Sequence, residues 1–131
     1  MTVSDKLKWY RIQSGFLQRD IAKAMEIDRT TYLRYESNVL DAYPLDKLSK
    51  AADLFGIELP QLLDDYNLFL YLGQGQQMKK LRKSMGITQL QLAQLMGISL
   101  GTLKPWERNK VNMMKSSFQK LLKLNKALID L

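Results

Sequence analysis

Apolar residues recur at three- and four-residue steps in two separate stretches of the chain, the period of amphipathic helices. In residues 86–107 these positions are Leu92, Ala93, Met96, Ile98, Leu103 and Trp106. Gly97 interrupts them and suits the left-handed residue that ends a helix, and Ser99 suits the N-cap of the next helix. The pattern therefore predicts two short helices joined by a very tight turn, with the first starting at Thr88 or Gln89.

This unit occurs twice. A shift of 71 residues lays residues 15–36 on residues 86–107 without a gap, and seven of the 22 columns are identical. The identical pairs are Gly15/Gly86, Gln18/Gln89, Ala22/Ala93, Met25/Met96, Ile27/Ile98, Thr31/Thr102 and Glu36/Glu107. Because the repeat is in register, we expect the function of the unit to be its own property.

Two details of the repeat predict how its helices meet. Ala22 and Ala93 are small enough for two steeply crossing helices to approach closely. In the first copy Glu26 replaces the turn glycine and Asp28 replaces the N-cap serine. Glu26 is the weaker turn residue, because the left-handed conformation costs more for a residue with a Cβ.

An arginine precedes a glutamate by 25 residues in both copies: Arg11 with Glu36, and Arg82 with Glu107. Such pairs are expected to meet as shielded ion pairs that brace the first helix of each copy against the third. We interpret these four residues as structural.

The composition argues against an enzyme. The chain has no cysteine and no histidine, so disulfides, thiolate metal sites, cysteine nucleophiles and the commonest general base are excluded. No pair of its thirteen acids stands in a catalytic context; Asp64 and Asp65 are typical of a solvated helix face. We therefore expect no catalytic residue, no metal and no cofactor.

The chain also lacks a long apolar run and a signal-peptide pattern at its amino terminus. This predicts a cytoplasmic protein without a membrane partner.

Charge is distributed unevenly. Residues 1–66 carry nine Lys and Arg against eleven Asp and Glu, whereas residues 67–131 carry eleven against two. A net charge of −2 thus precedes one of +9. The basic half predicts a polyanionic partner, nucleic acid first and an anionic membrane surface second.

Both copies resemble the helix-turn-helix of phage repressors and Cro, the lambda-repressor-like family. The resemblance rests on RIQSGFLQRDIAKAMEIDRTTYLRYE and LRKSMGITQLQLAQLMGISLGTLKPWE, and it continues into PLDKLSKAADLFGIELPQLL, which resembles the family's fourth and fifth helices. It implies an all-α protein of two tandem domains with about nine helices.

The expected organisation follows. The first domain spans 1–72, GQG at 73–75 forms a short joint, and a truncated second domain spans 76–131. The helices of the first domain are expected near 5–14, 18–26, 29–37, 45–55 and 59–72. Those of the second are expected near 76–85, 89–96, 100–108 and 115–129, the last a basic amphipathic helix that packs on its own domain through Phe118, Leu121, Leu122, Leu128 and Ile129.

In this family the first turns of the third helix enter the major groove of DNA, which implies base-reading roles for Arg29, Thr30, Leu33 and Arg34. Gln18 is expected either to contact a phosphate or to brace the third helix. Arg19 is a further phosphate candidate.

The second domain departs from the family pattern at the matching positions, which are Leu100, Gly101, Lys104 and Pro105. Pro105 is expected to bend or shorten the helix. This domain is expected either to hold phosphates or to bind a protein instead. Its phosphate candidates are Gln89, Lys79, Lys80, Lys83, Lys104, Lys110 and Lys115.

The resemblance implies a sequence-specific regulator of transcription, such as a bacterial or phage repressor, that binds double-stranded DNA, and a homodimer is common in the family. The alternative is an antitoxin-like module whose helices bind a protein partner. The apolar run at 67–75 is expected to lie partly in such a contact or between the domains.

Overall fold

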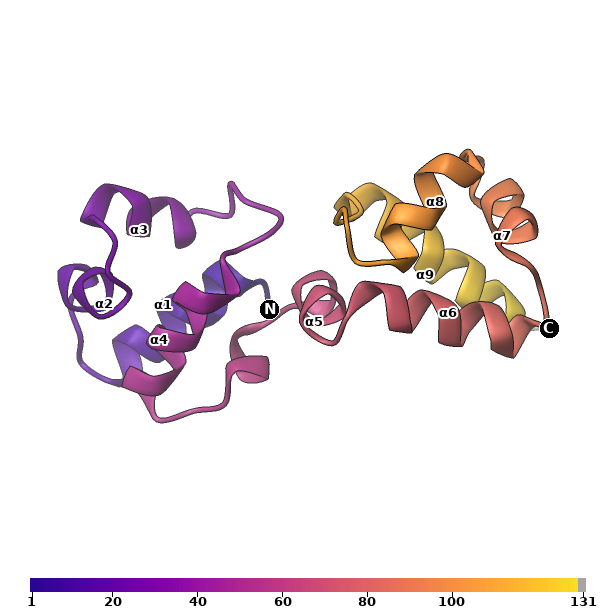
Figure 1. Ribbon diagram of the computed structural model, residues 1–131. Helices are drawn as coiled ribbons and strands as arrows, with labels where there is room; N and C mark the ends of the chain where they lie inside the picture. The colour runs from indigo at the N-terminus through magenta and orange to yellow at the C-terminus, as the bar shows by residue number, and fades with distance from the viewer. Residues whose placement is uncertain (130–131) are drawn as a thin grey trace. The chain divides into compact units, whose positions relative to one another are not determined.

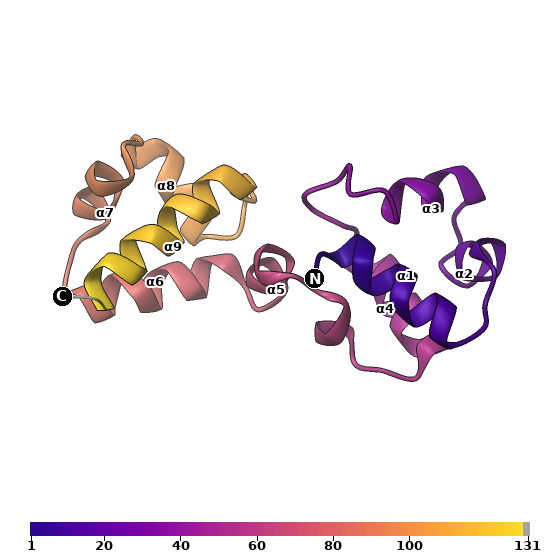
Figure 2. The ribbon, with the colours of Figure 1, turned by 180° about the vertical axis from the view of Figure 1, so that it is seen from behind.

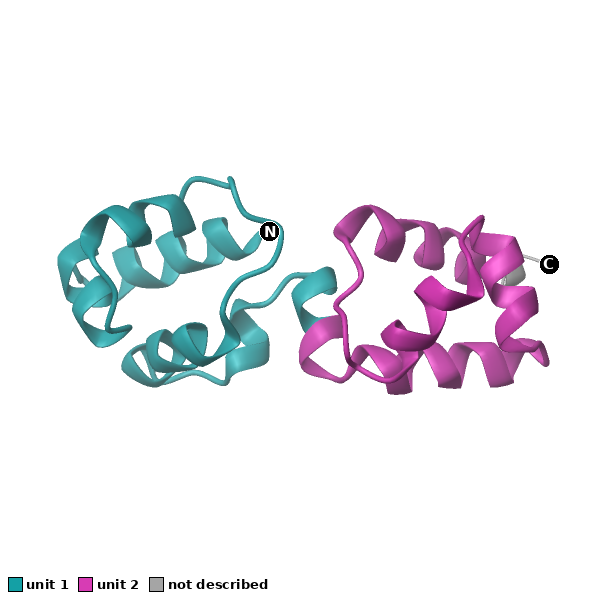
Figure 3. Ribbon diagram, turned by 45° about the horizontal axis from the view of Figure 1, so that its top comes forward, with its two compact units in different colours: residues 1–68 teal, residues 69–131 magenta. Residues whose placement is uncertain are grey.

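The structure is a computed structural model that describes residues 1–129, with side chains described as far as Lys126. The described residues form helices joined by short loops (Figures 1 and 2). The chain is divided into two compact units, residues 1–68 and residues 69–131 (Figure 3). Each unit is described by itself below.

The first unit holds six helical elements, the last of which crosses its boundary. They are α1 (Val3–Gln13), α2 (Gln18–Ala24), α3 (Arg29–Tyr35), α4 (Leu45–Phe55), the 3-10 turn η1 (Leu59–Leu62) and α5 (Asp65–Tyr71). The second unit holds α6 (Gln74–Met85), α7 (Gln89–Met96), α8 (Leu100–Glu107) and α9 (Lys115–Ile129). The all-α fold of tandem helix-turn-helix units is as the sequence predicts.

Local capping explains where most helices begin and end. Thr2 and Asp5 form a reciprocal capping box, so α1 begins at Val3, before the predicted residue 5. Thr88 caps α7 in the same way, and its first helical residue is Gln89. Gly56 ends α4 in the left-handed conformation, so α4 has the bounds 45–55 that the sequence predicts.

The helix predicted over 59–72 is two elements. Leu63 is extended between η1 and α5, and the Asp64 carboxylate accepts the backbone N–H of Asn67, which starts α5. The break lets both Leu62 and Leu63 point into the core, where each is buried. The local reason for the break is the Asp64 side chain, which caps a new helix at this point.

The predicted domain boundary and joint also differ from the structure. The division into units falls inside α5: Leu68 packs against the core of the first unit, and the Phe69 ring lies 4.9 Å from the Phe118 ring of the second. Residues 73–75 are no separate joint, because Gln74 and Gly75 form the first turn of α6 and are buried.

The core of the first unit gathers apolar side chains from α1 to η1. Its largest fully buried members are Leu7, Ile21, Met25, Tyr32, Leu48 and Leu62. In the second unit the corresponding residues are Met78, Leu92, Leu103 and Met113. Helix α9 runs beside α6 in the same direction in both ribbon views and buries Phe118 and Leu121, while Leu122 is exposed. The side chains of Leu128 and Ile129 lie outside the described part.

A close backbone approach makes Gly75 necessary in α6. A Cβ on Gly75 would lie 2.2 Å from the carbonyl oxygen of Glu107, the last residue of α8. Gly101, in α8, faces open space, since a Cβ there would meet only the Ser99 hydroxyl at 3.8 Å. A side chain at position 75 would therefore clash with α8, whereas position 101 has room for one.

We expect Gly75→Ala to destabilise the second unit by about 1–3 kcal/mol, because the helices must move apart. Gly101→Ala is the matched control and should be neutral or stabilising by up to about 1 kcal/mol. Urea unfolding followed by the fluorescence of the buried Trp106, in a Trp9→Phe background, measures both. Equal effects of the two substitutions would contradict the assignment.

Candidate nucleic-acid interface

The turn between α2 and α3 is as sharp as the sequence predicts. Glu26 is left-handed with a φ of 59°, and the Asp28 carboxylate accepts the Thr31 backbone N–H at 2.6 Å. Ala22 is buried, as is its counterpart Ala93. The first copy thus places a glutamate where most residues with a Cβ are disfavoured.

Helix α3 divides its residues between a buried and an exposed side. Tyr32 and Tyr35 are buried. The residues expected to read bases are exposed on its surface, and they are Arg29, Thr30, Leu33 and Arg34. The helix therefore presents two cations, a hydroxyl and an apolar side chain to solvent.

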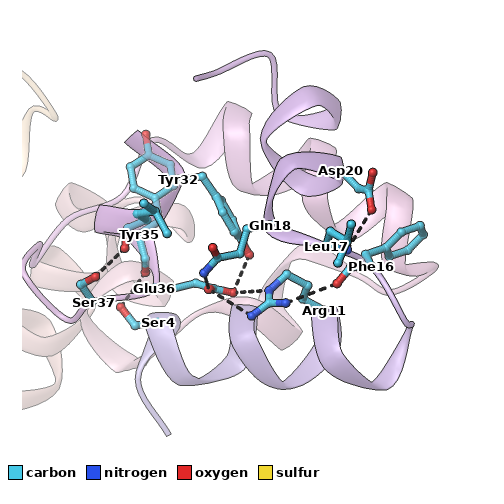
Figure 4. A network of polar contacts seen from close by, with 11 residues as sticks. Ser4, Arg11, Phe16, Leu17, Gln18, Asp20, Tyr32, Tyr35, Glu36 and Ser37 are labelled. Carbon is cyan, nitrogen blue, oxygen red and sulfur yellow. Dashed lines mark hydrogen bonds and ion pairs between the residues drawn. The ribbon is translucent and has the colours of Figure 1, made fainter. Parts of the chain in front are cut away.

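A buried carboxylate at the end of α3 joins three helices (Figure 4). Glu36 Oε1 lies 2.7 Å from Arg11 Nε of α1, and Glu36 Oε2 accepts from Gln18 Nε2 of α2 at 2.9 Å. The Tyr32 hydroxyl donates to Glu36 Oε1 at 2.9 Å. The ion pair that the sequence predicts is therefore present and carries two further donors.

The amide nitrogen of Gln18 is bonded to Glu36, as the bracing role requires, and its contact with a DNA phosphate stays a prediction. Its counterpart Gln89 is half-buried at the start of α7. Within the described residues no hydrogen bond joins the Gln89 side chain to Glu107. Only Gln18 is therefore bonded to the glutamate of its own copy, despite the identical place of the two glutamines in the repeat.

The network determines the charge states of its members. Burial raises the pKa of the Glu36 carboxyl, but hydrogen bonds from Arg11, Gln18 and Tyr32 more than offset it and hold the pKa below its ordinary value of 4.5. Hydrogen bonding to Glu36 raises the pKa of Arg11. Burial, with the Glu36 charge, raises the pKa of Tyr32. All three groups therefore keep their ordinary charges at neutral pH.

Three arginines from three helices line one hollow of about 300 Å³ on the first unit. They are Arg11 of α1, Arg19 of α2 and Arg29 of α3, and Leu17 and Gln18 complete the lining. Arg11 is committed to Glu36, whereas Arg19 and Arg29 are exposed. The guanidinium group of Arg19 suits a phosphate oxygen, while Arg29 belongs both to this hollow and to the exposed face of α3. The hollow adjoins the face that carries the base-reading candidates.

The second copy keeps the ion pair but not its additional donors. Arg82 Nε and Nη2 both approach Glu107 Oε1, at 3.3 and 3.2 Å. Leu103 stands where Tyr32 donates in the first copy, and Glu107 Oε2 is buried without a hydrogen-bond partner. The Glu107 carboxylate thus accepts fewer hydrogen bonds than the Glu36 carboxylate. A buried oxygen without a hydrogen bond lowers the stability of the second unit.

The tip of α8 is poor in polar groups. Leu100, Lys104 and Pro105 are half-buried and Gly101 is exposed. The helix continues through Pro105 to Glu107, so it is not cut short. Pro105 lacks an N–H, which leaves the Gly101 carbonyl without its helical donor. Lys104 is the one side chain of this group that can make a charged contact.

Cations cover the second unit. Between residues 69 and 129 the sequence has one acid, Glu107, and it is buried. The exposed or half-buried phosphate candidates stand on three helices and a loop: Lys79, Lys80 and Lys83 on α6, Lys104 on α8, Lys110 in the loop, and Lys115 at the start of α9. Within the described part of this unit, no exposed acid therefore neutralises their field.

Two buried amides that sequence reasoning did not single out hold the loops that follow the third helices. Asn67 accepts the Tyr43 N–H and donates to the Asp41 carbonyl. Gln74 accepts the Met113 N–H at 2.8 Å and donates to the Val111 carbonyl at 2.7 Å. The two residues differ in type and place in the repeat, so no periodic signal marks them.

The comparisons with known proteins establish the family. A helix-turn-helix family profile matches residues 7–62 and again residues 78–128, so the two matches span most of the chain. The chain belongs to the lambda-repressor-like helix-turn-helix family, in two tandem copies. No curated protein and no solved structure is significantly similar to it. The helix-turn-helix family comprises DNA-binding regulators of transcription rather than enzymes.

The described residues of the tandem helix-turn-helix protein contain neither a membrane-spanning helix nor an acidic metal site. In residues 1–129 no helix is long and apolar enough to cross a membrane. The same residues contain no group of three or more acids that could hold a metal ion.

We expect the destabilising effect of Glu36→Gln to shrink as the pH falls. The folded-state pKa of Glu36 is depressed, so its contribution is full above the unfolded pKa near 4.5 and is lost as the pH falls through the folded value. At neutral pH the substitution leaves Arg11 without its carboxylate and should cost about 3 kcal/mol.

Urea unfolding at neutral pH and at about pH 3 measures this dependence. Glu26→Gln is the matched control, because it removes the exposed ion pair with Lys50 and should cost little at either pH. An undiminished cost of Glu36→Gln in acid would count against the network as the source of its stability.

Proposed function

We propose that this protein is a sequence-specific regulator that binds double-stranded DNA, reads bases mainly with α3 and adds phosphate contacts from its second unit. The observation that carries the proposal is the arginine-lined hollow beside the exposed face of α3. Phosphate contacts position a protein on DNA, and base contacts give it specificity. Both kinds of group lie next to each other on the first unit.

The side chains of α3 match the chemistry of the major groove. Arg29 and Arg34 can each donate two hydrogen bonds to the O6 and N7 atoms of guanine. Thr30 can contact a base edge, and Leu33 can pack on a thymine methyl. Arg19 completes the set by contacting the phosphate backbone from α2.

The second unit is suited to phosphates rather than to bases. The tip of α8 offers Lys104 and little else that can bond to a base edge, while the other lysines of the unit lie on α6, in the loop after α8 and on α9. Lys110 in the following loop, Lys115 at the start of α9 and the amide of Gln89 are the other contacts assigned to it. Phosphate contacts contribute similar affinity for DNA of any sequence, and their contribution is greatest at low salt.

The alternative function is an antitoxin-like module that binds a protein. Exposed Tyr71 and Leu72 favour it, since these neighbouring large side chains are about half exposed. The same pair suits a homodimer contact, which the family commonly uses. Co-expression with the products of adjacent genes, followed by purification of a stoichiometric complex, would favour this function over the first.

We expect the double substitution Arg29→Ala and Arg34→Ala to cost about 1–3 kcal/mol for each lost base contact and to relax base preference at those positions. Selection of duplexes from a random pool gives the base preference, and fluorescence anisotropy with the selected duplex gives the binding free energy. Lys8→Ala, at an exposed cation of α1, is the control and should leave the preference unchanged. Unchanged binding by the double variant would refute the assignment of α3.

We expect Lys104→Ala and Lys110→Ala together to weaken selected and unrelated duplexes alike. Each lost phosphate contact should reduce the slope of log K against log salt by about 0.9. Titrations between about 0.05 and 0.2 M salt measure the slope. A loss confined to the selected duplex would instead indicate that the second unit reads bases.

A further inference from the structure

A hollow on the second unit lies between the end of α7 and the outer side of α9. Its volume is about 520 Å³, and its lining residues are Gln94, Leu95, Met96, Gly97, Lys120, Lys123 and Leu124. The apolar side chain of Leu95 is 54% exposed, and Lys120 and Lys123 are exposed as well. The hollow therefore combines an apolar floor with a cationic rim.

The corresponding place on the first unit holds an ion pair. There α2 ends at Ala24, and the left-handed Glu26 is paired with Lys50 of α4. Hydrogen bonding to Lys50 lowers the pKa of Glu26, so the pair stays ionised at neutral pH. Alanine at position 24 leaves no apolar side chain like Leu95 to be covered.

The repeat identifies the lysine of the second unit that corresponds to Lys50. Helices α4 and α9 pack on α2 and α7, respectively. The buried pair Leu48 and Ala51 on α4 has the same spacing as Phe118 and Leu121 on α9. This correspondence lays Lys120 on Lys50.

The second copy keeps the lysine, as Lys120, but has no carboxylate at the position that corresponds to Glu26. Gly97 occupies the place of Glu26, and it lines the hollow together with Lys120. No acid in residues 69–129 other than the buried Glu107 can replace it. Lys123 adds a second cation where α4 has Asp53.

We propose that this hollow receives an acidic segment of a partner protein, which inserts an apolar side chain beside Leu95 and Leu124. Its carboxylate binds Lys120 as Glu26 binds Lys50 in the first unit. Recognition of this kind joins an apolar anchor in a groove to charge complementarity at its rim. The net positive field of the second unit attracts such a segment before contact.

The hollow does not suit a nucleic acid. A phosphate would contact Lys120 and Lys123 but would leave the apolar floor of Leu95, Met96 and Leu124 uncovered. The hollow also lies at the carboxyl end of α7, about 10 Å along the helix from Gln89, the residue assigned to DNA. The proposal is therefore independent of the DNA-binding function, and each can fail without the other.

The experiment selects random 12-residue displayed peptides on the full chain at about 0.15 M salt, the physiological range. The enriched peptide is then synthesised with a fluorophore for anisotropy. We expect peptides that combine Asp or Glu with a Leu, Phe or Trp three or four residues away. Their affinity should fall at least about ten-fold in Leu95→Ser and in Lys120→Glu.

Two matched controls make the result specific. Leu90→Ser alters a leucine of the same helix that is 52% exposed and does not line the hollow. Arg108→Glu reverses an exposed charge outside it. Both should bind the peptide within about two-fold of the wild type.

A third variant reproduces the first unit in the second. Gly97→Glu restores the missing carboxylate opposite Lys120, and Glu26 demonstrates that a glutamate adopts this left-handed conformation in the repeat. We expect it to abolish peptide binding while the second unit stays folded, with a lower midpoint of thermal unfolding because a residue with a Cβ is strained at the φ of 68° that Gly97 adopts. A peptide whose acids are replaced by lysine should in turn bind Lys120→Glu better than it binds the wild type.

Three results would overturn the proposal. One is the absence of an acidic and apolar consensus, or a consensus peptide that Leu95→Ser and Gly97→Glu bind normally. Another is self-association of the chain that Leu95→Ser abolishes, which would make the occupant a second copy. The third is a loss of duplex DNA affinity in Leu95→Ser without a loss of peptide affinity.

Discussion

The buried carboxylate at the end of each third helix is the constraint on which both units depend. A charge removed from water must be paired and hydrogen-bonded, or the fold does not tolerate it. Glu36 meets this condition with Arg11, Gln18 and Tyr32, so a single side chain holds α1, α2 and α3 together. The exposed face of α3 is thereby held on a rigid base, which base reading requires.

The second copy retains the same pair with less support, and its surface has changed. Leu103 removes one donor, and Glu107 Oε2 is left buried without a partner. The tip of α8 has lost the polar groups that α3 presents, while lysines surround the unit. The two units therefore share the packing of their helices but expose different side chains, because the residues that hold the helices together are not those that face solvent.

Glycine and glutamate at one turn illustrate how the copies diverge. Both Glu26 and Gly97 adopt the left-handed conformation, with φ of 59° and 68°. Glycine adopts it without strain, and the glutamate contributes an ion pair with Lys50 at the surface. The backbone is therefore shared, whereas the side chain decides whether the lysine beside the turn has a carboxylate partner.

The sequence by itself determined the repeat, the two helix-turn-helix units and the ion pairs, because helical period, capping residues and a constant spacing of 25 are all local or repeated signals. It did not determine the break at Leu63, the inclusion of Gln74 and Gly75 in α6, or the buried amides of Asn67 and Gln74. Only the tertiary structure decided these, since each depends on which groups distant in the chain must be buried or bonded. Leu62 and Leu63 share one core, Gly75 meets the Glu107 carbonyl, and neither contact leaves a periodic trace in the chain.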